Sequence, residues 1–168
     1  IIVISSGAVA SGRSELKIHR KLDAVSARQL FSAVGQAKLI NRYYELFREH
    51  NIACGQVLTT KENFSTRRQY LTQKQCMEVM LKNKVIPIVN ENDTISTEEF
   101  GIGDNDTLSA IVAVTIQADL LILLSDIDGL FDGDPRKNPD AKLIDTVEKI
   151  DEHIISLGGG SGSSLGTG

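Results

Sequence analysis

Four short apolar runs divide this chain, and longer segments with a different spacing lie between them. The runs cover residues 1–4, 52–58, 85–89 and 120–124. They are rich in Ile, Val and Leu and do not alternate with polar residues. This pattern predicts strands that are buried on both faces of a parallel sheet.

The segments between the runs have the spacing of amphipathic helices. Apolar residues recur near the i, i+3 and i+4 positions over 30–47, over 70–81 and over about 107–117. Alternation of strands and helices predicts an α/β fold, in which right-handed crossovers cover a parallel sheet with helices.

Small and polar residues follow three of the four runs. SSGAVASG follows the first run, NEND follows the third and SDIDGLFDGDPR follows the fourth, while GDND stands a short distance beyond NEND. Ligands of such sheets bind at the carboxyl ends of the strands. The sequence therefore predicts a site built from these segments.

The residue types in NEND and GDND suit a zwitterionic ligand. One of residues 104–106 is predicted to cap the helix that follows. Asn105 and Asp106 are then expected to face the site together with Asn90 and Asp93. Amide side chains both donate and accept hydrogen bonds, and an aspartate can receive an ammonium group.

Three glycine- or aspartate-rich segments allow two interpretations each. SSGAVASG fits either an anion-binding turn or an ordinary strand-to-helix turn. The aspartates over 126–134 do not form an EF-hand, because either register places Leu130 at a ligand position. A nucleotide-binding loop is favoured there, with turn chemistry as the alternative for 132–135. The closing GGGSGSSLGTG fits a linker or a backbone nest for phosphate oxygens.

Composition narrows the class of protein. The net charge is −4 and no run of Lys or Arg exceeds two, which argues against a nucleic-acid or anionic-membrane surface. No apolar run approaches the roughly 20 residues that span a bilayer. Cys54 and Cys76 lack further Cys or His at metal-ligand spacing, which predicts reduced core cysteines in a cytoplasmic protein and no metal site. Both chain ends look cut, so we expect an internal piece of a longer protein.

Taken together, SSGAVASG, AVGQ at 33–36, NEND, GDND, LLSDIDGLF and SGSSLGTG resemble the amino acid kinase family, in the expected order over essentially the whole chain. The resemblance implies a three-layer αβα sandwich with a mainly parallel central sheet, forming one domain over 1–168 that is incomplete at both ends. The family's first strand, with its phosphate-loop lysine, would precede Ile1. A second lysine would follow Gly168.

The resemblance also implies an activity. It predicts transfer of the γ-phosphoryl group of ATP, with Mg²⁺, to the side-chain carboxylate of L-glutamate, which is the first step of proline biosynthesis. It further implies a homo-oligomer, with proline as a candidate feedback inhibitor. Because the chain itself holds neither lysine, we do not expect these 168 residues alone to catalyse the reaction.

The same resemblance implies functions for individual residues. The residues expected to bind glutamate, or to lie beside it, are Ser6, Gly7, Ala8, Asn90, Asp93 and Asn105. The residues expected to hold the nucleotide are Ser125, Asp126, Thr167 and Gly168. Asp106 is expected to organise the catalytic lysines.

Two alternatives stay open at this point. Another amino acid kinase, such as one acting on N-acetylglutamate, would have less use for Asp93, because that substrate has no free ammonium group. A non-catalytic amino-acid-binding module is the second alternative, since a fold does not fix a function. Lysines in the two flanks would favour the enzyme.

Overall fold

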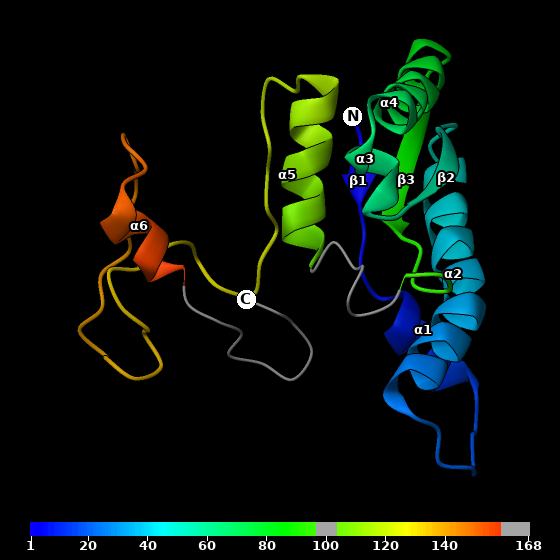
Figure 1. Ribbon diagram of the computed structural model, residues 1–168, viewed down its shortest axis with the longest axis horizontal. Coiled ribbons are helices and arrows are strands. Elements are labelled where there is room, and N and C mark those ends of the chain that lie inside the picture. Colours follow the sequence, from blue (N-terminus) through cyan, green and yellow to red (C-terminus); the bar gives the residue numbers. More distant parts are fainter. Residues whose placement is uncertain (97–103, 159–168) are drawn as a thin grey trace. The chain divides into compact units, whose positions relative to one another are not determined.

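The computed structural model describes residues 1–96 and 104–158 and divides the chain into two compact units, Ile1–Leu121 and Ile122–Gly168. The expectation of one domain over 1–168 stays a prediction. The elements of the first unit, shown in Figure 1, are in chain order β1 (Val3–Ile4), α1 (Ala8–Glu15), α2 (Ala24–Arg48), β2 (Ala53–Thr59), α3 (Glu62–Ser65), α4 (Arg67–Lys82), β3 (Val85–Glu91) and α5 (Asn105–Ile116).

The sheet of the first unit has three parallel strands in the order β1-β3-β2. Strand β3 lies in the middle, and its Val89 is paired with Ile4 of β1 and with Val57 of β2. Helices connect the strands in sequence, as parallel pairing requires. The predicted α/β class and parallel sheet are therefore confirmed, and so are the first three predicted strands.

Alternation along β3 directs its side chains to two different helix layers. Val89 belongs to a buried cluster formed with residues of β2, α4 and α5, namely Val57, Met77, Leu108 and Val112. The next residue, Asn90, donates a hydrogen bond to Gln36 of α2. Helices therefore cover both faces of the sheet, as in an αβα sandwich.

Side-chain caps mark where three helices of this unit begin. Asp23 accepts from the N–H of Ser26, and Thr66 accepts from the N–H of Gln69. The prediction that GDND caps the following helix is confirmed at Asp104, whose Oδ1 lies 2.7 Å from the backbone nitrogen of Thr107. Such caps satisfy N–H groups that have no partner within the helix.

Two glycines let α1 and α2 touch backbone to backbone. A Cβ atom at Gly35 of α2 would overlap the carbonyl oxygen of Ala8 in α1. A Cβ at Gly12 of α1 would overlap the carbonyl oxygen of Phe31 in α2. No other residue type fits at these positions without moving the helices apart.

The predicted strand over 120–124 is wrong. Within the part of the chain that the structure describes, these residues form no strand, and their side chains are exposed. A strand needs a neighbour that pairs with its N–H and C=O groups. None of the three described strands pairs with this segment, so its apolar composition alone does not make it a strand.

In the second unit, the described residues 122–158 form turns, one short helix and an isolated antiparallel bridge. The helix is α6 (Glu152–Leu157), and the bridge joins Phe131 to Leu143. The Asp132 carboxylate accepts from the N–H of Lys142, and the Asp134 carboxylate accepts from that of Arg136. Turn chemistry therefore accounts for both aspartates, which was the alternative interpretation of 132–135.

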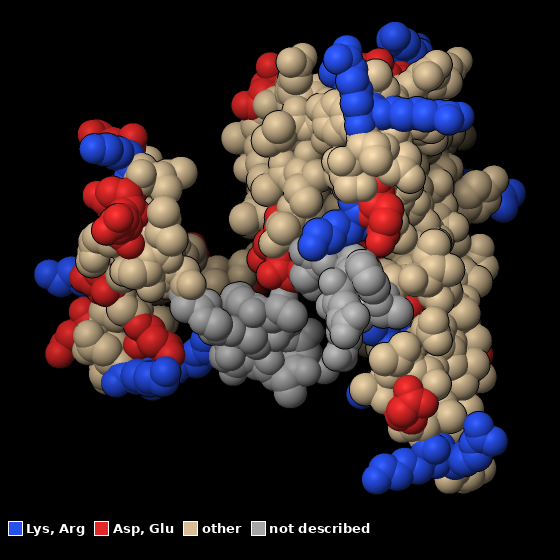
Figure 2. All heavy atoms as spheres, viewed as in Figure 1, with Lys and Arg blue, Asp and Glu red and all other residues tan. Residues whose placement is uncertain are grey.

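Both cysteines are free as predicted, but only Cys54 is partly buried, which raises the pKa of its thiol, and Cys76 is exposed rather than in the core. No helix in 1–96 or 104–158 is long and apolar enough to cross a membrane. On the face shown in Figure 2, basic and acidic side chains of the described residues lie interspersed.

Candidate active site

The carboxyl ends of β1 and β3 meet at one edge of the sheet. The backbone nitrogen of Ser5 donates to the carbonyl of Val89 over 3.0 Å, so SSGAVASG begins beside NEND. Ser5 is buried, and its hydroxyl accepts from the phenol of Tyr43 in α2 at 2.8 Å. The sequence-based expectation that these two segments share one edge is confirmed.

The turn after β1 presents two of its three predicted site residues to solvent. Ser6 and Gly7 are exposed, whereas the side chain of Ala8 is buried. Gly7 has φ 103° at the N-terminus of α1, and its carbonyl accepts from Ser11. Because a positive φ favours glycine, the turn alone explains this residue. Contact of Ser6, Gly7 and Ala8 with a ligand stays a prediction.

Asn90 is the centre of a chain of amide groups that links three elements. Its Nδ2 donates to Gln36 Oε1 at 3.1 Å, and its Oδ1 accepts from the N–H of Glu91 at 2.9 Å. The same Oδ1 accepts from Nδ2 of Asn105, at the start of α5, at 3.3 Å. The structure therefore brings Asn90 and Asn105 together, and Asn90 is buried.

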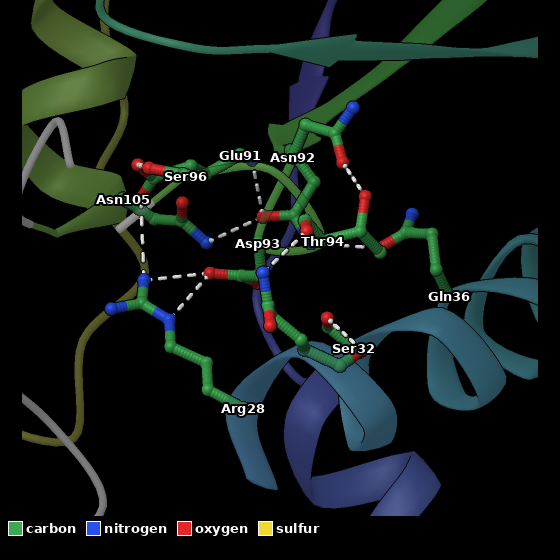
Figure 3. A network of polar contacts seen from close by, with 11 residues as sticks. Arg28, Ser32, Gln36, Glu91, Asn92, Asp93, Thr94, Ser96 and Asn105 are labelled. Atoms are coloured by element: carbon green, nitrogen blue, oxygen red, sulfur yellow. Dashed lines mark hydrogen bonds and ion pairs between the residues drawn. The ribbon is translucent and has the colours of Figure 1, made fainter. Parts of the chain in front are cut away.

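Asp93 lies in the turn after β3 and forms an ion pair with Arg28 of α2 (Figure 3). Its Oδ1 is 2.6 Å from one terminal nitrogen of Arg28 and 2.8 Å from Nε. The same terminal nitrogen is 3.5 Å from Glu91 Oε2. Burial raises the pKa of the Asp93 carboxyl and Glu91 adds to this rise, while Arg28 opposes both.

The backbone of this turn is held by a strand of the sheet and by α2. Asn92 N–H donates to the carbonyl of Thr59 in β2 at 2.7 Å. Gln29 of α2 donates from its side chain to the carbonyl of Thr94 at 2.9 Å. These bonds fix the path of the backbone through NEND, and therefore the position from which the Asp93 side chain extends.

Asp106 stands apart from that network. It lies in the first turn of α5 and is exposed, and within the described residues its carboxylate makes no hydrogen bond or ion pair. A carboxylate in that turn is favourably placed at the positive end of the helix dipole. The Asp106 carboxylate can therefore interact with cationic groups that are not among the described residues. Its catalytic role stays a prediction.

Two of the four predicted nucleotide residues lie in the second unit, and the other two are not described by the structure. Ser125 and Asp126 are exposed in the second unit, where the hydroxyl of Ser125 accepts from the N–H of Ile127 at 3.4 Å. Thr167 and Gly168 lie outside the described residues. All four assignments stay predictions.

Sequence reasoning missed the contribution of α2 to the site. Arg28, Gln36 and Tyr43 each contact a strand end or its turn, but only AVGQ was noticed, and no role was given to its glutamine. The sequence does contain a pattern that indicates this contribution. Gln29, Ser32 and Gln36 place polar side chains at i, i+3 and i+7, which is one face of a helix that also carries apolar residues.

Among the described residues, no group of three or more His, Cys, Asp or Glu side chains is arranged to hold a metal ion. Mg²⁺ is usually held by only one or two carboxylates together with substrate phosphates. The exposed carboxylate of Asp106 fits that mode.

Comparisons with known proteins agree with the geometry. The family model described as "Amino acid kinase family" matches residues 1–167. Similar curated proteins include the glutamate 5-kinase of Bacteroides thetaiotaomicron, 67% identical over 88% of this chain and 41% of that protein. The glutamate 5-kinase of Haemophilus influenzae is 46% identical over 100% of this chain and 46% of that protein. The glutamate 5-kinase of Carboxydothermus hydrogenoformans is 46% identical over 100% and 45%.

The chain spans less than half the length of these relatives. Its matched region nevertheless contains the sheet, both strand ends and the network around Asn90 and Asp93. The chain belongs to the amino acid kinase family.

Proposed function

We propose that the protein containing this chain transfers the γ-phosphoryl group of ATP to the side-chain carboxylate of L-glutamate. The product is glutamyl 5-phosphate, and the reaction is the first step of proline biosynthesis. The family and the names of three relatives support a kinase of this kind. One observation carries the choice of substrate: a nearly buried carboxylate, Asp93, stands at the sheet edge beside the Asn90–Asn105 amide pair.

The chemistry of that edge suits the amino end of glutamate. Asp93 can receive an ammonium group, while Asn105 and the hydroxyl of Ser6 can hydrogen-bond a carboxylate or its neighbours. Gly7 and Ala8 lie beside Ser6 in the same turn, and Asn90 orients Asn105. These six residues form the proposed glutamate site.

Phosphoryl transfer to a carboxylate is limited by charge rather than by proton removal. The side chain of free glutamate loses its proton at about pH 4.3, so it is already ionised at neutral pH. Two unit charges about 4 Å apart repel by roughly 4 kcal/mol at an effective dielectric of about 20. Mg²⁺ bound to ATP, together with basic side chains, offsets this repulsion in such reactions. Asp106 is the residue proposed to organise those cations.

The nucleotide is assigned to the later part of the chain. We assign Ser125 and Asp126, with Thr167 and Gly168 of the final glycine-rich segment, to ATP. The family supports this assignment, since its members use ATP and usually Mg²⁺. Assembly into a homo-oligomer and inhibition by proline are proposed on the same basis.

Replacing Asp93 by alanine in the complete gene product tests the glutamate site. The KM for L-glutamate is expected to rise about ten- to hundredfold, because losing a charged hydrogen bond costs about 1.5–3 kcal/mol. The KM for ATP is expected to change little. Steady-state kinetics with each substrate varied in turn measures both constants. Equal increases in the two would indicate a general folding defect and remove Asp93 from the glutamate site.

A further inference from the structure

Arg28 is the only Lys or Arg within the described residues that forms an ion pair with the NEND segment. Figure 3 shows its side chain reaching from α2 toward Asp93. The guanidinium contacts one oxygen of that carboxylate, Oδ1, through both Nε and a terminal nitrogen. The other oxygen, Oδ2, makes no hydrogen bond or ion pair within residues 1–96 and 104–158. One half of the carboxylate is held, and the other half can accept a ligand.

The charges around Asp93 show why a cation is needed there. The side chains of Glu91 and Asp93 are only 7% and 11% exposed, and Arg28 is the partner of both. Arg28 places one guanidinium beside two carboxylates, and an ammonium group at Asp93 would add a second positive charge. Without Arg28, burial and the charge of Glu91 would raise the pKa of the Asp93 carboxyl unopposed.

The backbone of the turn is also held by hydrogen bonds that do not involve this ion pair. Asn92 is bonded to Thr59 and Thr94 is bonded to Gln29, and neither contact involves Arg28. Within the turn, Ser96 N–H donates to the carbonyl of Asn92 at 2.9 Å. These bonds support the backbone path directly, whereas the ion pair contacts the Asp93 carboxylate itself.

We propose that Arg28 is a positioning residue for substrate binding: it holds Asp93 by Oδ1 in the charged form, so that Oδ2 is directed to the ammonium group of the amino acid. The proposal rests on the proposed function and extends it to a residue of α2. It makes the selection for a free ammonium group depend on an ion pair, because Asp93 alone would be protonated more readily in this buried position.

The test compares three variants of the complete gene product with the parent protein. Arg28→Gln removes the charge, and Arg28→Lys keeps it. Arg42→Gln is the matched control, since Arg42 lies on the same helix, is mostly exposed and forms its ion pair among the described residues with the exposed Glu45. KM and kcat are measured for L-glutamate and for ATP between pH 6 and pH 8.5.

Arg28→Gln is expected to raise the KM for glutamate roughly tenfold near pH 7. The KM for ATP and kcat are expected to stay within about twofold of the parent. The ratio of variant to parent KM for glutamate should grow as the pH falls. The ratio grows in this direction because Arg28 lowers the pKa of Asp93, whereas burial and Glu91 raise it. As the pH falls, the Asp93 carboxylate of the variant is therefore protonated at a higher pH than that of the parent. Arg28→Lys should recover most of the loss, and Arg42→Gln should match the parent.

Several results would overturn the positioning role while leaving the proposed function intact. One such result is that the parent phosphorylates glutamate and Arg28→Gln has the same KM for glutamate as the parent. A KM ratio that is constant with pH is another, because it would indicate direct contact with the substrate or a structural defect. An Arg28→Lys variant no better than Arg28→Gln is a third. A parent that does not phosphorylate glutamate at any pH would overturn the proposed function and this inference together.

Discussion

Replacing Gly35 by alanine is expected to destabilise the protein by about 2 kcal/mol or more. A Cβ at this position would overlap the Ala8 carbonyl oxygen and the backbone nitrogen of Gly12. Overpacking costs about 1–3 kcal/mol where side chains can adjust, and backbone atoms adjust less. The better helix propensity of alanine returns only about 1 kcal/mol. The thermal unfolding midpoint of the complete gene product should fall by about 4 °C or more.

The matched control for this substitution is Gly133→Ala. A Cβ there would meet nothing nearer than Asn138 Nδ2 at 3.9 Å, so its unfolding midpoint should stay close to that of the parent. The contact between α1 and α2 also positions the site, because α1 starts at the turn after β1 and α2 carries Arg28 and Gln36. A Gly35→Ala protein as stable as the parent would show that the two helices do not pack through their backbones.

Replacing Asp106 by asparagine is expected to lower kcat roughly a hundredfold with little change in stability. Asp106 is proposed to organise the cations that stabilise transition-state charge, and losing one part of such stabilisation typically costs about this much in kcat. The asparagine side chain has nearly the same shape, and the Asp106 carboxylate has no hydrogen bond or ion pair among the described residues, so folding should be unaffected. Steady-state kinetics and a thermal melt of the same sample measure both effects.

Asp119→Asn is the control for that loss. Asp119 is an exposed carboxylate just beyond the C-terminal end of α5, so it carries the same charge at the opposite end of the helix from Asp106. Its kcat should equal that of the parent. If Asp106→Asn retained more than about a third of the parental kcat, the residue would have no part in organising the catalytic cations.

Much of the first unit could be predicted from the sequence because its local signals agree with one another. Short runs rich in apolar residues correctly predicted β1, β2 and β3, since strands buried by helices on both faces have no regular polar alternation. The cap at Asp104 was predictable in kind, because an aspartate before an apolar segment satisfies the first N–H groups of a helix.

The strand predicted over 120–124 was wrong for a reason that a local pattern cannot reveal. Pairing depends on which other strand lies alongside, and a five-residue apolar run contains no information about its neighbour. Within the described residues these side chains are exposed, with Leu124 at 95%. Hydrophobicity indicated that the segment could be buried, but not what would bury it.

The candidate site was predicted in part for a similar reason. Asn90, Asp93 and Asn105 could be predicted as neighbours because the carboxyl ends of parallel strands share an edge. Arg28 could not be placed there, since it precedes Asp93 by 65 residues and reaches it only because α2 packs against the sheet. Its role depends on tertiary contacts rather than on any motif.

The most direct test of this account is the substrate preference of the complete gene product. With ATP and Mg²⁺, acyl-phosphate formation is trapped with hydroxylamine, and kcat/KM is compared for L-glutamate, N-acetylglutamate and L-aspartate. A site that uses Asp93 to receive an ammonium group should prefer L-glutamate over N-acetylglutamate by at least about a hundredfold, because the acetylated substrate leaves a nearly buried carboxylate unpaired. Equal or faster reaction with N-acetylglutamate, or no hydroxamate from glutamate, would contradict the account.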